Sequence, residues 1–248
     1  MLSQIEKAER LRALHLDPHL LVLVNVWDVA SAQAVARVAG CTAIATASAA
    51  VAAAHGYADG EQIPPDLVFD SLRRICAAVD LPVTADLERG YADPPDTIAQ
   101  ALDAGAVGYT LEDAMCPVAE MTDRIAAAVA VGGARGIPAV LNARTDVYLA
   151  HREWPEERRY AEARHRGLAY LEAGADCVFV PGLTAGASIR GLVDAFGRGR
   201  LSLITAVGLP DYDVLRQWGV ARVSHGPYPH RQAMAALATY AAHQLDQP

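Results

Sequence analysis

The amino-acid sequence predicts an α/β fold, a (β/α)8 barrel of the TIM type that forms a single domain over residues 1–248. Short runs rich in valine, isoleucine and leucine alternate with longer segments of helical periodicity along the whole chain. The runs show no period-two alternation, which is typical of parallel strands covered on both faces. Eight such strand–helix units match the usual barrel size of about 250 residues.

The predicted strands follow one another at regular intervals. They are LVLVNV (21–26), TAIAT (42–46), PVTADL (82–87), VGYTLE (107–112), PAVLNA (138–143), DCVFVP (176–181), LSLITA (201–206) and ARVS (221–224). Helical periodicity lies between them, for example in SAQAVARVA, PDLVFDSLRRICAAV and PEERRYAEARHRGLAYLEA, and at the N-terminus. A doubly wound open sheet is the alternative, but no GxGxxG motif follows the first strand to favour it.

A weak internal repeat supports this count of strands. The segments AGCTAIATAS (39–48), AGAVGYTLED (104–113), AGADCVFVPG (173–182) and WGVARVSHG (218–226) each place a glycine between a helix end and the next strand. Glycine suits that position because the residue after a helix often adopts a left-handed conformation. We therefore expect αβ turns there, at the end of the barrel opposite the active site. No Ser/Pro-rich linker divides the chain, which favours one domain.

Composition and charge narrow the class of function. Hydrophobic residues make up 52% of the chain, enough for a sizeable core. The net charge of -8 disfavours nucleic acid and anionic membranes as partners, because neither attracts an acidic surface. Four scattered cysteines, none in a CxxC pair, favour reduced thiols. With no apolar segment typical of a signal peptide or a membrane span, we expect a cytoplasmic enzyme.

Acidic side chains gather at the ends of two neighbouring predicted strands. Asp86 and Glu88 belong to the end of the third strand, and Glu112 ends the fourth. Active sites of barrels lie at the C-terminal ends of the strands, so these acids are expected on one rim. Clustered carboxylates without matching cations are typical of a hard divalent cation, most often Mg2+, held partly through water. A helix N-cap is the alternative for any single acid, and it explains Asp93 and Asp113 equally well.

Two more segments carry candidate substrate contacts. Asn142, Arg144 and Asp146 end the fifth strand in LNARTD. The planar guanidinium of Arg144 suits bidentate binding of a carboxylate or phosphate, with a buried ion pair as the alternative. Ser48 precedes a stretch of small residues where backbone N–H groups can approach a ligand closely. Asp59 lies in a turn-rich segment long enough to fold over the barrel mouth, although an ordinary turn would also explain it.

Five motifs, taken in order, resemble the isocitrate lyase/phosphoenolpyruvate mutase superfamily. They are NVWDVASAQAV, ATASAAVAAAHGYADGE, VTADLERGYAD, GYTLEDA and LNARTD, and the resemblance extends from about residue 20 to residue 185. It implies a (β/α)8 barrel that binds Mg2+, with Mn2+ as a substitute, and a small 2-oxo or 2-hydroxy carboxylate as substrate. It also implies an enolate-type intermediate and a homotetramer, built from dimers that exchange their last helix.

The resemblance also implies roles for individual residues. Asp86 is similar to the direct metal ligand of the superfamily, while Glu88 and Glu112 are similar to the acids that hold metal-bound water. Arg144 is similar to the residue that grips the carboxylate or phosphonyl end of the substrate, with Asn142 beside it. Asp59 stands at the position of an aspartate that lies near the reacting centre. The wall that binds the 2-oxo acid carboxylate corresponds to Ala47, Ser48 and Ala49.

The chain departs from the lyases of this superfamily after the fourth strand. Those lyases carry a long gating loop with a KKCGH-like or KRCGH-like stretch, whose cysteine protonates the enolate. This chain has AMCPVAEMTDRIAAA instead and moves almost directly into the next helix. Cys116 remains a candidate catalytic residue, with a packed turn cysteine as the alternative. His225, at the end of the eighth strand, is a candidate that a structural histidine would explain equally well.

Three hypotheses for the function follow. The first is a Mg2+-dependent lyase that cleaves or forms a carbon–carbon bond in a small di- or tricarboxylate through an enolate. The second is a phosphonopyruvate-type P–C bond mutase or hydrolase, with an oxaloacetate hydrolase between the two. The lysine and asparagine of phosphonate-handling members are missing, and VFVPGLT after the sixth strand is apolar, which disfavours the second hypothesis. The third is a barrel that binds a carboxylate without turnover.

Overall fold

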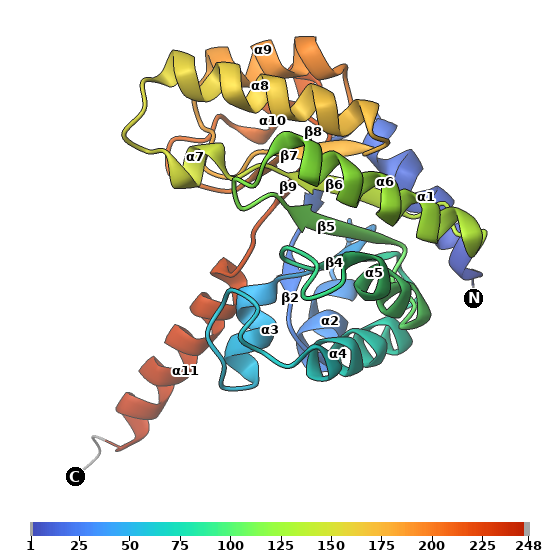
Figure 1. Ribbon diagram of the computed structural model, residues 1–248. Helices are drawn as coiled ribbons and strands as arrows, with labels where there is room; N and C mark the ends of the chain where they lie inside the picture. The colour runs from blue at the N-terminus through green and yellow to red at the C-terminus, as the bar shows by residue number, and fades with distance from the viewer. Residues whose placement is uncertain (1, 246–248) are drawn as a thin grey trace.

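The computed structural model describes residues 2–245 and shows a barrel of parallel strands surrounded by helices (Figure 1). The strands pair in the order β1-β9-β8-β7-β6-β5-β4-β3-β2. Val24 alone separates β1, which pairs with β9, from β2, which pairs with β3, so this segment closes the ring. The strands are β1 (Leu21–Leu23), β2 (Asn25–Val26), β3 (Ile44–Thr46), β4 (Val83–Asp86), β5 (Gly108–Glu112), β6 (Val140–Arg144), β7 (Cys177–Phe179), β8 (Leu201–Ile204) and β9 (Arg222–Ser224).

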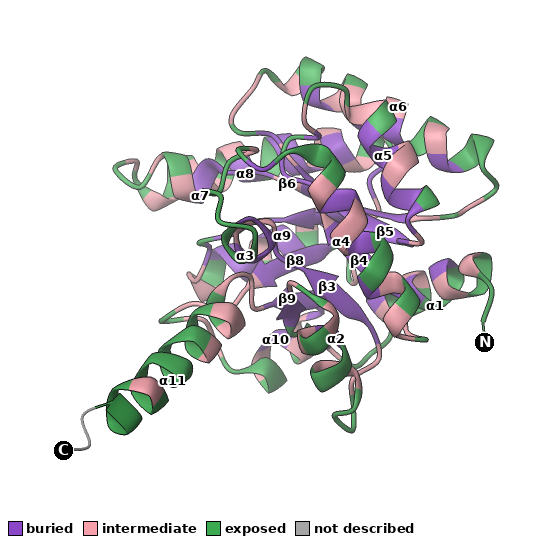
Figure 2. Ribbon diagram, turned by 90° about the horizontal axis from the view of Figure 1, so that it is seen from below, coloured by how far each residue is buried: buried purple, intermediate pink, exposed green. Residues whose placement is uncertain are grey.

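The predicted (β/α)8 barrel is thus confirmed, with the first predicted strand interrupted at Val24. The helices lie outside the strands, whose residues are largely buried (Figure 2). The helices are α1 (Gln4–Leu16), α2 (Val29–Ala36), α3 (Ser48–Ala54), α4 (Pro65–Ala78), α5 (Pro94–Asp103), α6 (Val118–Ala134), α7 (Val147–Ala150), α8 (Glu156–Glu172), α9 (Gly186–Phe196), α10 (Tyr212–Trp218) and α11 (Tyr228–Leu245).

Side-chain caps begin several of these helices. The carboxylate of Asp28 accepts a hydrogen bond from the backbone N–H of Ser31 at the start of α2, at 2.7 Å. Asp93 caps α5 in the same way, through the N–H of Asp96 at 3.1 Å. These caps satisfy N–H groups that have no partner within the helix. The N-cap explanation of Asp93 is therefore the correct one.

The repeated glycines occupy left-handed turns, as the repeat predicted. Gly105 has a φ of 101° two residues after the end of α5, and Gly174 has a φ of 109° two residues after the end of α8. The equivalent glycines of the other two segments, Gly40 and Gly219, have φ values of 92° and 95°. A side chain would be strained in this conformation, so glycine lets each helix turn sharply into the next strand.

Helix α1 covers the N-terminal end of the barrel. Leu11 of α1 is fully buried in a cluster that includes Leu23 of β1 and Val140 of β6. A Ser3–Glu6 capping box fixes the beginning of the helix. Because this end is filled by α1, the opposite end of the barrel, where the strands terminate, is the one available to a ligand.

Helix α11 extends away from the barrel into solvent (Figure 1). It contains no buried residue, although Met234, Leu237 and Tyr240 are large apolar side chains that are exposed by 44% to 66%. Exchange of the last helix between subunits, implied by the resemblance, stays a prediction that agrees with this uncovered helix. None of the helices within residues 2–245 combines the length and the apolarity needed to cross a membrane.

Candidate active site

A cavity of about 600 Å³ opens at the C-terminal ends of the strands, and every strand from β2 to β9 contributes to its lining. This is the end of a barrel at which active sites lie. The predicted site residues that line the cavity are Ala47, Ser48, Ala49, Asp59, Asp86 and Arg144. The predicted residues that do not line it are Glu88, Glu112, Cys116 and Asn142.

Asp86 ends β4 and points into this cavity. Its Oδ2 atom accepts hydrogen bonds from the backbone N–H of Ser48 at 3.1 Å and from the Ser48 hydroxyl at 2.8 Å. The backbone N–H of Asp86 donates to the hydroxyl of Thr46 at 3.0 Å, which ties the ends of β3 and β4 together. Its Oδ1 atom is buried and has no hydrogen-bond partner among residues 2–245.

Glu88 lies two residues beyond β4, in a left-handed conformation with a φ of 50°. Its Oε2 atom accepts from the backbone N–H of Glu61 at 2.7 Å, while its Oε1 atom is buried without a partner among the described residues. Burial, together with the nearby carboxylates of Asp86 and Asp59, raises the pKa of Glu88 to about 7. The contact with Glu61 also anchors the predicted mouth segment that carries Asp59.

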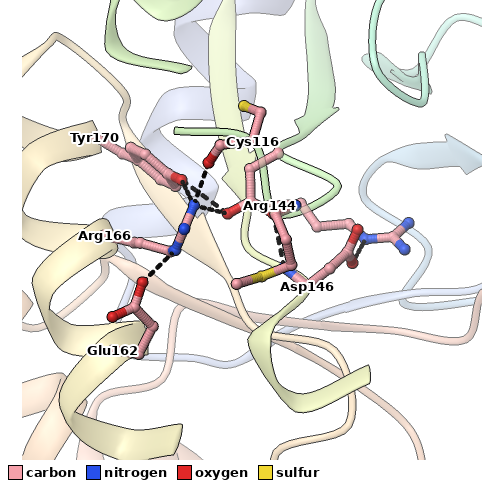
Figure 3. A network of polar contacts seen from close by, with 8 residues as sticks. Cys116, Arg144, Asp146, Glu162, Arg166 and Tyr170 are labelled. Carbon is pink, nitrogen blue, oxygen red and sulfur yellow. Dashed lines mark hydrogen bonds and ion pairs between the residues drawn. The ribbon is translucent and has the colours of Figure 1, made fainter. Parts of the chain in front are cut away.

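Glu112 and Arg144 end the neighbouring strands β5 and β6 in register. Nη1 of Arg144 lies 2.6 Å from Oε2 of Glu112. The Nε atom of Arg144 donates to Oδ1 of Asp146 at 2.7 Å (Figure 3). Burial raises the pKa of Glu112, although the charge of Arg144 opposes this effect. The buried ion pair that was the alternative for Arg144 is therefore present, and Arg144 lines the cavity as well.

Asp113 is fully buried behind the cavity and organises the turn after β5. Its carboxylate accepts hydrogen bonds from the Tyr170 hydroxyl at 2.7 Å and from Nη1 of Arg166 at 3.2 Å, both on α8 (Figure 3). It also accepts from the backbone N–H groups of Met115 and Asp146, each at 3.0 Å. Asp113 thus supports the turn and positions Asp146, the partner of Arg144.

Cys116 is placed away from the cavity. It packs against the apolar cluster between the barrel and its outer helices, and its backbone carbonyl accepts from Nη1 of Arg166 at 2.8 Å. Burial raises the pKa of its thiol, which disfavours a thiolate. The left-handed residues Ala114 and Met115 turn the chain directly toward α6. This placement favours a packed turn cysteine, the alternative to a catalytic role.

Asn142 and His225 also lie outside the cavity lining. Asn142 is fully buried, and its amide nitrogen donates to the hydroxyl of Thr110 at 3.2 Å, while its Oδ1 atom has no partner among residues 2–245. The ring of His225 contacts the Tyr212 hydroxyl at 3.2 Å, and its backbone N–H donates to Asn25 at 2.9 Å. These contacts agree with a structural role for His225.

The cavity also contains residues that the sequence did not single out. Arg222 on β9 lines it from inside the barrel, and Arg152 and Arg231 line it from the loop after α7 and the beginning of α11. An arginine inside the short apolar strand ARVS was the one signal available for Arg222. The other two lie in segments without a motif, so only the fold brings them to the cavity.

The acids fit a cation that is bound largely through water. Within residues 2–245, no three His, Cys, Asp or Glu side chains converge as a ready metal-binding group. A cage made directly by Asp86, Glu88 and Glu112 is therefore not what the structure shows. Two buried oxygens, Oδ1 of Asp86 and Oε1 of Glu88, nevertheless have no partner in the described part of the chain. Unpartnered buried oxygens of this kind suit a hydrated hard cation such as Mg2+.

Comparisons with known proteins agree with the motifs. The sequence profile of the family described as phosphoenolpyruvate phosphomutase matches residues 11–245. The Mycobacterium tuberculosis (strain CDC 1551 / Oshkosh) protein MT2054 is 31% identical over 223 residues, which cover 88% of this chain and 81% of that protein. An oxaloacetate decarboxylase from Bradyrhizobium sp. (strain BTAi1) is 29% identical over 205 residues, covering 78% of this chain and 68% of that enzyme.

Solved structures give the same result. A candidate phosphonomutase from Burkholderia cenocepacia J2315 is 42% identical, with a TM-score of 0.92, and the match covers 98% of this chain and 100% of that one. The barrel, the ordered motifs and the family match across most of the sequence are thus in agreement. The chain belongs to the phosphoenolpyruvate phosphomutase family and is an enzyme of the isocitrate lyase/phosphoenolpyruvate mutase superfamily.

Proposed function

We propose that the chain is a Mg2+-dependent lyase that cleaves or forms a carbon–carbon bond in a small 2-oxo or 2-hydroxy di- or tricarboxylate, through an enolate intermediate. The observation that carries this proposal is the carboxylate of Asp86 inside the cavity. Ser48 fixes one of its oxygens, and the other is buried with no partner among residues 2–245. Leaving such an oxygen unsatisfied is costly, and a hard cation would satisfy it.

The neighbouring acids support the same reading. Glu88 and Glu112 lie near Asp86, but neither lines the cavity. This placement suits acids that contact the cation through water molecules. The pKa values of Glu88 and Glu112 are raised because both carboxyl groups are buried and because other carboxylates lie nearby. Mg2+ bound there would polarise a carbonyl oxygen of the substrate and stabilise the negative charge that develops on it.

Other cavity residues would bind and orient the substrate. The small side chains of Ala47 and Ala49 leave the backbone around Ser48 open to a carboxylate. Two nitrogens of Arg144 are held by Glu112 and Asp146, so its remaining nitrogen, Nη2, is the one to bind the distal anionic group. A guanidinium fixed in this way binds an anion without losing further side-chain freedom.

Asp59 is the better placed of the two candidates for moving a proton. It lines the cavity from the mouth segment, which Glu61 ties to Glu88, whereas Cys116 lies outside the lining. A proton donor has to lie within hydrogen-bond reach of the carbon that it protonates. We therefore propose that Asp59, and not Cys116, exchanges the proton with the enolate.

Two similar proteins favour two alternative reactions, both of which would pass through an enolate. The oxaloacetate decarboxylase from Bradyrhizobium sp. favours oxaloacetate as the substrate, by decarboxylation or by hydrolysis. The candidate phosphonomutase from Burkholderia cenocepacia, at 42% identity, favours cleavage or rearrangement of a P–C bond. For the protein as a whole we propose a cytoplasmic homotetramer, a dimer of dimers in which α11 is exchanged.

The test is to incubate the purified protein with Mg2+ and four acids: 2-methylisocitrate, malate, oxaloacetate and phosphonopyruvate. We expect release of a 2-oxo acid from one of the first three, or of oxalate and acetate if oxaloacetate is hydrolysed. Phosphate release or rearrangement is expected only if the enzyme acts on the P–C bond of phosphonopyruvate. Asp86→Asn should abolish both turnover and Mg2+ binding by calorimetry. Asp123→Asn, a change of the same kind on the exposed face of α6, should alter neither. Bound Mg2+ with no turnover of any acid would support the non-catalytic alternative.

A further inference from the structure

Arg222 is a buried cation without a counter-ion in the described part of the chain. Arg222 is only 4% exposed, and its Nε and Nη1 atoms have no hydrogen-bond partner among residues 2–245. No ion pair within that part of the chain includes it. Taking a guanidinium out of water costs several kcal/mol unless an anion or other acceptors replace the water. The described residues therefore hold a buried positive charge for which they supply no partner.

The charge lies at the floor of the cavity. Arg222 begins β9, two residues before Ser224, so it lies deeper in the barrel than the mouth. Thr84 of β4 and Thr110 of β5 line the same cavity from the opposite side of the barrel. Both are buried, and the Thr110 hydroxyl, which accepts from the Asn142 amide at 3.2 Å, still has its own proton to donate. We call Arg222, Thr84 and Thr110 the floor site.

The groups that surround Arg222 do not neutralise it. His15 on α1 lies below, and burial together with the charge of Arg222 lowers its pKa to about 3, so the ring is neutral. Cys177 on β7 lies beside it, and burial raises the pKa of that thiol to about 12. Asp86 on β4 is the acid that acts on Arg222 through space, but its hydrogen bonds go to Ser48 and not to the guanidinium.

We propose that the floor site binds a carboxylate of the substrate, so that the enzyme selects acids with two or more anionic groups over their singly charged analogues. The guanidinium offers donors in a planar fork, and the two threonine hydroxyls can donate to the same ligand from the facing wall of the cavity. The opposite side of the cavity, at Asp86, is the side proposed for the metal. A dianion that spans the cavity would thus meet a positive charge at each end. The assignment to substrate rests on the proposed function, but anion binding at the floor can be measured without turnover.

The test compares pairs of ligands with the same shape and different charge. Isothermal titration calorimetry, with and without Mg2+, would measure binding of oxalate against oxamate and of succinate against succinamate. A hydrogen-bonded charge pair is worth about tenfold to a hundredfold in affinity. We expect the intact protein to prefer at least one dicarboxylate to its monoamide by this factor. Arg222→Met should remove the preference, and Arg222→Lys should keep part of it.

Arg231→Met is the matched control, because Arg231 is a cation at the mouth of the same cavity. It should leave the preference for that dicarboxylate unchanged. If instead Arg231→Met removes the preference while Arg222→Met preserves it, the anion binds at the mouth and the proposal is wrong. Loss of the preference in both variants would also overturn an assignment to the floor.

Thermal unfolding separates a binding role from a structural one. Replacing an unpaired buried cation with an apolar side chain of similar length is often neutral or stabilising. Arg222→Met should therefore melt at or above the temperature of the parent protein without ligand, and should gain less stability from the dicarboxylate. A lower melting temperature with an unchanged ligand preference would show that Arg222 is structural. Failure to turn over any acid would contradict the proposed function but would leave these binding results intact.

Discussion

The guanidinium of Arg144 lies 2.6 Å from the carboxylate of Glu112, across the paired strands β6 and β5. On its other side, Nε of Arg144 donates to Asp146 at 2.7 Å. Only about a fifth of the Arg144 side chain is exposed, at 20%. This arrangement holds the cation at the cavity wall in one orientation, with two acids that depend on its charge.

Loss of Arg144 should therefore affect both stability and activity. Arg144→Met leaves Glu112 and Asp146 buried without their cation, at a cost of about 3 kcal/mol in the free energy of unfolding. It should also lower kcat/KM by about a hundredfold or more, since a preorganised charge is lost. Arg144→Lys should recover part of the stability but little activity, because an ammonium cannot hold both acids and the substrate. Urea denaturation and steady-state kinetics would check both effects.

The raised pKa of Glu88 predicts how stability depends on pH in the absence of metal. Its pKa is about 7 in the folded protein, against 4.5 as its ordinary value. The folded state therefore binds this proton more tightly than the unfolded state does. The stabilisation is complete below about pH 4.5 and is lost as the pH rises through about 7. Urea denaturation in EDTA between pH 5 and 8 would measure this fall. Glu88→Gln should make it smaller, and the remainder is expected from Glu112, whose pKa is raised to about 8.

Mg2+ should reverse the trend, because bound cation favours the ionised acids. Its affinity, measured by calorimetry, should increase as the pH rises from about 6 to about 8. Glu120→Gln serves as the control for Glu88→Gln, since Glu120 is an exposed acid on α6. The same pH profile for stability in the intact protein and in Glu88→Gln would contradict the assignment.

The buried network behind the cavity predicts a positioning role for Tyr170. Its hydroxyl donates to Asp113 at 2.7 Å, and Asp113 in turn accepts from the backbone N–H of Asp146. Tyr170→Phe leaves one carboxylate oxygen of Asp113 with Arg166 alone, and should cost about 1–2 kcal/mol of stability. It should lower kcat more than it raises KM, because Asp146 and hence Arg144 are less firmly held. Tyr160→Phe on the same helix should change stability by less than about 0.5 kcal/mol.

The sequence predicted the barrel because each strand is a local apolar run, and pairing in register follows once eight such runs alternate with helices. The positions of Asp86 and Arg144 followed for the same reason, since each ends a strand and strand ends define the cavity. The partners of Asp113 could not be predicted. Tyr170 is 57 residues away and meets Asp113 only when α8 packs beside α6 and β7.

Arg222 was missed for a different reason. In a strand whose inner and outer neighbours are both buried, the sequence does not reveal which side chains point inward. The lack of a partner for Arg222 is likewise a property of the packed barrel. Cys116 follows Glu112 closely in the sequence, which made it a candidate for the site. Two left-handed residues between them direct the chain away from the cavity, and the sequence does not show this turn.

Cys116→Ala is expected to retain activity, because the thiol packs against the apolar core and not in the cavity. Its kcat should stay within about threefold of the parent value, since removing a general acid would cost about a hundredfold or more. Asp59→Asn should show that larger loss. Cys41→Ala, another partly buried cysteine, is the matched control. A loss of activity confined to Cys116→Ala would restore the cysteine as the proton donor.

The exposed apolar side chains of α11 predict that this helix is covered in the assembled protein. Leu237 and Tyr240 are 59% and 66% exposed on a helix with no buried residue. Exposed apolar side chains of this kind do not stabilise a single chain, but they are typical of a surface that another subunit covers. Leu237→Asp should place a charge in the proposed subunit contact and shift sedimentation velocity profiles from the proposed tetramer toward smaller species. Gln244→Asp, which introduces the same charge at an exposed polar position of the helix, should leave the tetramer intact. A parent protein that sediments as a monomer would contradict the exchange of α11, whatever the variants do.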